Sequence, residues 1–188
     1  MKVLILLLVV FLGVSIILGA GSSRRNNLHL VSDLDLQRYM GKWYEIARTD
    51  NRFERNMEHV EAVYRMLPNG HIEVINSGVD SRTGKSRKAI GKAHAGKVAG
   101  RLRVSFFWIF YSDYDILELG KDYEWALVGG SSQKYLWILS RTPQLPQPTL
   151  DTILHLARQR GYDTSKLIFD NWPAENPEPQ KSNAAIAK

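Results

Sequence analysis

Few side chains in this sequence have the types and spacing that enzymatic chemistry requires. The five histidines form no H-E-x-x-H metal-binding pair and stand far apart in the sequence: His29, His59, His71, His94 and His155. The sequence has no G-x-S-x-G nucleophile motif and no glycine-rich phosphate loop. It also has no cysteine, which excludes a thiol nucleophile, thiolate metal ligands and disulfides. We therefore expect a protein that is not an enzyme and that holds neither a metal nor a cofactor.

One pair of distant residues has complementary chemistry that a fold could use. Trp43 offers a large flat face, and Arg141 follows the apolar run WILS in the sequence WILSRTP. A guanidinium over a desolvated tryptophan face contributes about 2 kcal/mol or more. We predict that Arg141 stacks on Trp43. Gly41, which has no side chain, would leave room for the chain to pass close to this pair.

Short apolar runs separated by turn signals fill residues 41–141 and predict about eight strands. Pro68-Asn69-Gly70 separates EAVYRML from HIEVIN, which is a strong hairpin signal. Leu102, Val104 and Phe106 alternate along one run and should share one face of a strand. This regular spacing predicts an antiparallel sandwich or barrel. An eight-stranded barrel has room for side chains or for one small ligand, and Arg141 on Trp43 would close its base.

A single helix is predicted after the strands, and it ends at Gly161. Thr149 is expected to cap its N-terminus, and Asp151 is expected in its first turn. Four apolar residues at helical spacing should pack against the outside of the sheet: Leu150, Ile153, Leu154 and Ala157. The run KLIFDN then predicts one more short strand.

The two ends of the chain differ in composition from the strand-rich part. Residues 1–21 contain a long apolar run and predict a signal peptide or an N-terminal membrane anchor, and hence export. We expect a linker over 22–32, a barrel domain over 33–172 and a disordered tail over 173–188, where proline and polar residues are frequent. Leu18-Gly19-Ala20 resembles the start of a bacterial lipobox, but Gly21 stands where the acylated cysteine would be.

The net charge of +6 comes from lysines and arginines that are scattered along the chain. No nucleic-acid recognition motif accompanies them, so we expect no nucleic-acid partner. A solvated basic surface is one interpretation of this charge. A basic rim that lies near anionic lipid headgroups is the alternative.

Three short motifs in this sequence resemble those of the lipocalin family. Gly41-Lys42-Trp43 is similar to the first family motif, Tyr111-Ser112-Asp113-Tyr114 more loosely to the second, and Arg141 to the third. The longer strings YMGKWYEIARTDNRFER and YLWILSRTP resemble the bacterial outer-membrane lipocalins, with apolipoprotein D as an animal relative. The resemblance covers residues 33–172. It implies an all-β, eight-stranded antiparallel up-and-down barrel with one C-terminal helix packed outside.

The resemblance also implies a function. Members of this bacterial branch are exported proteins that carry fatty acids or lysophospholipids in the barrel and act at the outer membrane in envelope maintenance. The expected location is therefore the outer membrane or the periplasm. This branch usually has the acylated cysteine, so Gly21 leaves two modes open: a soluble periplasmic protein, or one that is anchored by its apolar leader.

Side-chain alternation and the resemblance together name the residues that could meet a ligand. If Arg141 faces inward at the base, Trp137 also faces inward, because side chains alternate along a strand. The resemblance adds Tyr64 as a residue that borders the pocket, and Phe106 is assigned from alternation. Glu45 shares its face with Trp43 and would be costly to bury unpaired. It could pair with Arg48 or Arg141, or it could bind an amine or choline headgroup.

The run from Phe106 to Tyr111 is rich in aromatic residues that cannot all be buried. An exposed apolar patch of this kind suggests contact with a membrane or with a second copy in a homodimer. This gives the alternative to a lipid carrier, which is a membrane-surface scaffold or interaction protein without a free ligand. A lipid-modifying enzyme is a third and less favoured interpretation.

Overall fold

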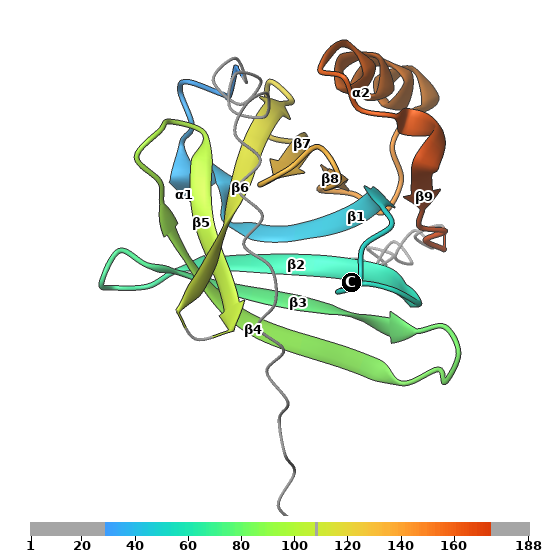
Figure 1. Cartoon of the computed structure of the whole chain (residues 1–188), viewed down its shortest axis with the longest axis horizontal. Helices are drawn as coiled ribbons and strands as arrows, with labels where there is room; N and C mark the ends of the chain where they lie inside the picture. Colours follow the sequence, from blue (N-terminus) through green and yellow to red (C-terminus); the bar gives the residue numbers. More distant parts are fainter. Residues whose placement is uncertain (1–28, 108, 174–188) are drawn as a thin grey trace, which may run out of the picture.

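The computed structural model describes residues 29–107 and 109–173, and nine strands of this part form one antiparallel sheet that closes on itself (Figure 1). The elements follow one another in this order: α1 (Leu36–Tyr39), β1 (Gly41–Thr49), β2 (Met57–Met66), β3 (Ile72–Asp80), β4 (Ser86–Ala95), β5 (Arg101–Phe107), β6 (Phe110–Leu119), β7 (Trp125–Gly130), β8 (Leu136–Ser140), α2 (Gln147–Gln159), η2 (Thr164–Lys166) and β9 (Leu167–Phe169). The predicted leader and nearly all of the predicted tail lie outside the described residues.

Strands β1 to β8 form the barrel, each paired antiparallel with the next, and β1 closes it. At one end of β1, Gly41 pairs with Tyr64 of β2, and Tyr44 pairs with Ser140 of β8. The predicted eight-stranded up-and-down barrel is therefore confirmed. We call the end of the barrel that holds Gly41 the base and the opposite end, which holds Thr49, the open end.

The predicted hairpin at Pro68-Asn69-Gly70 joins β2 to β3. Leu67 donates its N–H to His71 O at 2.8 Å, and Gly70 has a φ of +78°, which a residue without Cβ adopts at no steric cost. The turn lies at the base, together with the turns between β4 and β5 and between β6 and β7.

Two layers of apolar side chains explain why these strands form. One cluster fills the inside of the barrel at its base and includes Trp43, Tyr64 and Leu139. A second cluster lies between the outside of the sheet and α2, where Ile153 and Ala157 are fully buried against strand residues such as Leu136 and Ile138. The predicted packing of the helix on the outer face is confirmed (Figure 1).

The start of α2 differs from the prediction. The helix begins at Gln147, two residues before Thr149, with Pro146 at the N-cap position and no side-chain cap. Thr149 is therefore not the cap, and Asp151 lies beyond the first turn. The reason is that proline has a preset φ and lacks an N–H, so a helix can begin there without a capping side chain. The predicted end is confirmed, since Gly161 follows with a φ of +83°.

Two further features were not predicted. Helix α1 is a single turn, and Asp35 caps it by accepting hydrogen bonds from Gln37 N at 2.9 Å and Arg38 N at 3.2 Å. Ahead of it, Val31 donates its N–H to Ile116 O at 3.1 Å, so contacts with the barrel begin within residues 29–32.

Among the described residues, no helix has both the length and the apolar character needed to cross a bilayer.

Candidate functional site

The base of the barrel is closed by Arg141, which stacks on Trp43 as predicted. Its Cζ atom lies 3.7 Å from the centroid of the Trp43 ring. The same guanidinium donates to Lys42 O at 2.6 Å and to Arg38 O at 2.8 Å. Gly41 has a φ of +94°, and a Cβ atom there would lie 3.4 Å from Arg141 Nη1. The glycine therefore serves both the turn into β1 and the close approach of the arginine.

Above this base, three tyrosine hydroxyls form a chain that we call the tyrosine triad: Tyr39, Tyr64 and Tyr114. The Tyr64 hydroxyl donates to the Tyr114 hydroxyl at 2.9 Å, and the Tyr39 and Tyr114 hydroxyls are 2.6 Å apart. Burial raises the pKa of all three, that of Tyr64 to about 12, so the hydroxyls are protonated at neutral pH.

The triad has one more O–H hydrogen than its two hydrogen bonds use. Each hydroxyl can donate once, and two hydrogen bonds join the three groups. One O–H hydrogen therefore has no acceptor within the triad, and the described residues form no further hydrogen bond with these three hydroxyls. The inside of the barrel thus contains a spare hydrogen-bond donor, which the sequence analysis did not identify because it considered Tyr64 alone.

A lone acceptor lies on the same wall of the barrel. Asn76 of β3 pairs with Ala62 of β2, whose side chain belongs to the inner cluster, so Asn76 also faces inward. Its Oδ1 atom is buried and has no hydrogen-bond partner among the residues that the structure describes. The next residue of β2 that faces inward is Tyr64, so Asn76 and the triad are neighbours on the inner face. The sequence analysis missed Asn76, although its inward position follows from alternation along EVIN.

Trp137 faces the inside of the barrel, in agreement with the predicted alternation. Its ring packs against the inner cluster together with Leu139, whereas Leu136 and Ile138 belong to the outer cluster. The ring is parallel to that of Tyr135, with centroids 6.0 Å apart. Its Nε1 atom donates to Glu54 Oε2 at 2.9 Å. Trp137 therefore presents an apolar face on the inner wall and holds a residue of the loop between β1 and β2.

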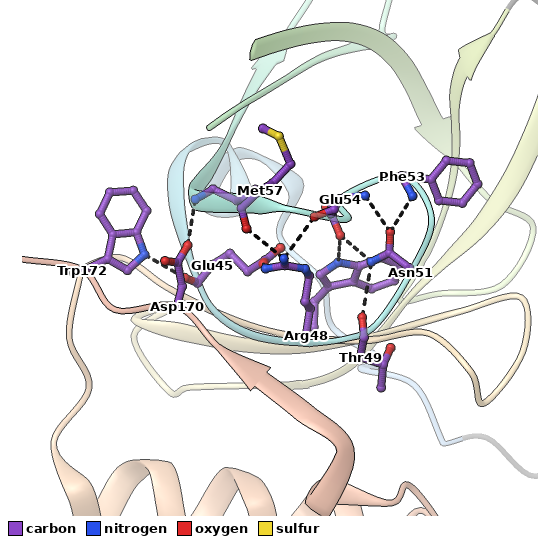
Figure 2. Close-up of polar contacts among 11 residues, drawn as sticks. Glu45, Arg48, Thr49, Asn51, Phe53, Glu54, Met57, Asp170 and Trp172 are labelled. Atoms are coloured by element: carbon purple, nitrogen blue, oxygen red, sulfur yellow. Dashed lines mark hydrogen bonds and ion pairs between the residues drawn. The ribbon is translucent and has the colours of Figure 1, made fainter. Parts of the chain in front are cut away.

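Glu45 forms the structural pair that was one of the two predicted roles (Figure 2). Its side chain is 3% exposed, and Oε1 lies 2.7 Å from Arg48 Nη1. Arg48, and not Arg141, is the partner. Arg48 Nη2 also donates to Met57 O at 2.9 Å and to Glu54 O at 3.1 Å. Burial and the nearby Glu54 raise the pKa of Glu45 well above its ordinary value.

The loop between β1 and β2 is ordered by a residue that the sequence analysis did not identify. Asn51 accepts from Phe53 N and Glu54 N through Oδ1, both at 3.0 Å, and donates to Glu54 Oε2 at 2.6 Å (Figure 2). An asparagine that bonds backbone groups two and three residues later is a common turn former. That local signal was available in the sequence DNRFER.

The inner face becomes more exposed from the base to the open end. Along β5, Leu102 is buried, Val104 is partly buried and Phe106 is 44% exposed. The Phe106 ring covers Gly91, where an added Cβ atom would lie 2.7 Å from Phe106 Cδ1. Gly91 alternates with the inward-facing Ala93 along β4, so the ring lies on the inner face near the open end. The barrel is closed at its base and accessible at its other end.

The described residues contain no group of three or more histidine, aspartate or glutamate side chains arranged to hold a metal ion. What the inner wall offers instead is an apolar surface, a spare hydroxyl donor, a lone amide acceptor and an opening at one end. These features suit the reversible binding of a mostly apolar molecule that carries a few oxygen atoms.

Comparisons with known proteins agree with this architecture. The family described as "Lipocalin-like domain" matches residues 34–171. The chain is 40% identical to outer membrane lipoprotein Blc of Vibrio cholerae serotype O1 over 158 residues, which cover 82% of this chain and 92% of that protein. It is 29% identical to apolipoprotein D of Mus musculus over 152 residues, which cover 72% of this chain and 75% of that protein.

Solved structures show the same fold at lower identity. Insecticyanin from the tobacco hornworm Manduca sexta aligns with a TM-score of 0.66 and 20% sequence identity. The alignment covers 79% of this chain and 86% of insecticyanin.

Proposed function

The chain belongs to the lipocalin family, and from this premise we propose that it binds a fatty acid or a lysophospholipid inside the barrel and stores or transports it in the cell envelope. The observation that carries the proposal is the presence of two unsatisfied polar groups on the inner wall, next to the apolar side chains of the inner cluster. The tyrosine triad has a spare O–H hydrogen, and Asn76 Oδ1 accepts from no donor within residues 29–107 and 109–173. A buried polar group without a partner costs free energy that a ligand can recover.

Lysophospholipid chemistry suits this pair better than fatty-acid chemistry does. A lysophospholipid carries an ester carbonyl, which accepts a hydrogen bond, and a free glycerol hydroxyl, which donates one. A fatty acid carboxylate only accepts. We propose that the triad donates to the ester or carboxylate oxygen and that Asn76 accepts from the glycerol hydroxyl. Trp137, Phe106 and Tyr64 would contact the apolar part of the ligand.

Of the two roles predicted for Glu45, we keep the structural ion pair and not the binding of a headgroup. Its carboxylate is already paired with Arg48 and is almost fully buried. Binding a headgroup there would require breaking a buried ion pair, which is strongly destabilising. We therefore propose that Glu45 supports the wall on which Trp137 and the loop between β1 and β2 rest.

The cellular location is proposed from the relatives and from the leader. The name of the Vibrio cholerae relative, an outer membrane lipoprotein, supports an exported envelope protein. The lipid anchor that this name implies is not transferred to this chain, because Gly21 provides no thiol for acylation. We also propose binding without catalysis, because the groups described at this site are hydrogen-bonding and apolar and do not place a nucleophile beside a base.

Native mass spectrometry of the purified protein, with and without added lysophospholipid, tests the proposal. We expect one adduct of lysolipid mass per barrel, weakened by Trp137→Ala and by Asn76→Ala. Trp125→Ala is the matched control, because Trp125 packs in the outer cluster and not in the inner one. A folded protein whose mass never shifts with either lipid would overturn the carrier function and favour the scaffold alternative.

A further inference from the structure

The open end of the barrel carries an apolar and basic surface that the proposed binding of a lipid inside the barrel does not use. Because consecutive strands run in opposite directions, four loops meet at this end: those between β1 and β2, β3 and β4, β5 and β6, and β7 and β8. We call the surface that they form the rim. The remaining hairpin turns lie at the base and provide an internal comparison.

The rim contains the largest concentration of exposed apolar side chains in the described part of the chain. Phe53 is 69% exposed, Ile109 63% and Phe110 67%, and Phe106 lies just inside them. Figure 2 shows that Phe53 points away from the polar cluster that orders its loop. Apolar side chains held outward on ordered loops are typical of a surface that binds a partner. The tryptophan of this run, Trp108, lies outside the described residues.

Basic residues surround these apolar side chains. The loops over 50–56, 81–85 and 131–135 contain five basic residues and two acidic ones, a surplus of three positive charges, and Arg87 and Lys88 follow at the start of β4. At the base, the turns over 67–71, 96–100 and 120–124 contain two basic and two acidic residues, a surplus of zero. Asp80 is buried and engaged by Arg82 and Arg87, whereas Lys85 and Lys88 are exposed. Among these loops and turns, the surplus of positive charge therefore lies at the open end.

We propose that the rim docks on an anionic lipid bilayer, with the apolar side chains in the interfacial region and the lysines and arginines against the headgroups. Charge complementarity selects this occupant over a second copy of the chain. Two rims facing each other would bring together two surfaces with the same positive surplus, which repel, whereas an anionic bilayer attracts each of them.

Docking in this orientation places the accessible end of the barrel against the bilayer. A lipid could then pass between membrane and barrel without crossing water. The docking itself does not depend on the proposed lipid-carrier function, but this route for the lipid does. The two can be separated, since docking is measured on vesicles and lipid binding is measured by mass.

Site-specific fluorescent probes test the orientation, because the chain has no cysteine and each introduced one is labelled uniquely. Ser131→Cys places an environment-sensitive probe at the rim, and Asn69→Cys places one at the base; both positions are exposed. With phosphatidylglycerol vesicles we expect a blue shift from the rim probe alone. Phosphatidylcholine vesicles should give a much weaker response. Equal shifts at both positions, as general adsorption of the chain would produce, overturn the proposal.

Matched variants test the chemistry of the rim in the same assay. Phe53→Ser with Ile109→Ser should lower partition onto phosphatidylglycerol vesicles about tenfold or more, whereas Ile90→Ser with Val98→Ser, exposed apolar residues elsewhere on the barrel, should not. Lys85→Glu with Lys88→Glu should weaken partition, unlike Lys97→Glu with Lys121→Glu at the base. A doubled mass in solution that the rim variants abolish, without vesicle binding, would show that the rim joins two copies instead.

Discussion

Trp137 Nε1 and Glu54 Oε2 are joined by a 2.9 Å hydrogen bond that connects the inner wall of the barrel to the loop at its opening. The same carboxylate oxygen accepts from Asn51 Nδ2 at 2.6 Å. A single oxygen of Glu54 therefore holds a wall residue and a loop residue together. A ligand that moves the Trp137 ring would also affect the loop that carries Phe53.

Replacing Glu54 tests this connection. Glu54→Ala leaves the Trp137 N–H and the Asn51 amide without their shared acceptor, and a lost bond to a charged group costs about 1–3 kcal/mol. We expect faster backbone hydrogen exchange over residues 50–56, measured by mass spectrometry. Glu58→Ala, which removes an exposed carboxylate on β2, is the control. Unchanged exchange in Glu54→Ala would show that Asn51 orders the loop without help from Glu54.

We predict that Arg141 contributes more to the free energy of unfolding than a surface arginine such as Arg65 does. Arg141→Ala removes the stacking on Trp43 and the bonds to Lys42 O and Arg38 O. We expect the free energy of unfolding in urea to fall by about 1–3 kcal/mol. Arg141→Lys should recover only part of this loss, since an ammonium lacks the planar fork. Arg65→Ala, which removes a surface arginine whose ion pair with Glu73 spans 3.5 Å, should change stability little.

The contact between Arg141 and Trp43 shows why the base was predictable from sequence. Trp43 lies in β1 and Arg141 directly follows the last residue of β8, so alternation along these strands predicted the direction of each side chain, and cation–π chemistry then paired them. The same alternation placed Trp137 on the inner face. Side chains alternate between the two faces of the sheet in every strand, so this pattern predicts on which face each strand residue lies.

The features that the sequence analysis missed are local or cooperative. Asn51 and Glu54 act through a turn, and α1 is one turn long, so neither has a repeating pattern. The tyrosine triad depends on hydroxyls from β2, β6 and α1 meeting at one point, which no single segment encodes. The start of α2 was misplaced because Pro146 and Pro148 begin the helix without a capping side chain.

Tyr114 is the central hydroxyl of the triad, and its removal should affect both stability and lipid binding. Tyr114→Phe eliminates both hydroxyl-to-hydroxyl bonds while the ring stays in place. We expect a loss of about 1–3 kcal/mol in the free energy of unfolding and a changed affinity for lysophospholipid in a fluorescence titration, because the acceptor that orders the Tyr39 and Tyr64 hydroxyls is gone. Tyr111→Phe, which removes a partly exposed hydroxyl, is the matched control. Full affinity in Tyr114→Phe would remove the triad from the proposed site.

The triad also predicts a loss of stability at high pH. Burial raises the pKa of Tyr64 from its ordinary value near 10 to about 12, and it raises those of Tyr39 and Tyr114 in the same direction. Between these two pH values the unfolded chain releases the Tyr64 proton and the folded chain keeps it, so the unfolded state binds fewer protons. The stabilisation is fully present below pH 10 and is lost as the pH rises toward 12.

Urea unfolding as a function of pH measures this loss. From Tyr64 alone, the free energy of unfolding should fall by about 1 kcal/mol between pH 9 and pH 11. Because lysines also titrate in this range, the readout is the difference in slope between wild type and Tyr64→Phe, and the variant should have the shallower slope. Parallel curves for wild type and Tyr64→Phe would mean that the Tyr64 hydroxyl ionises as easily in the folded barrel as in the unfolded chain.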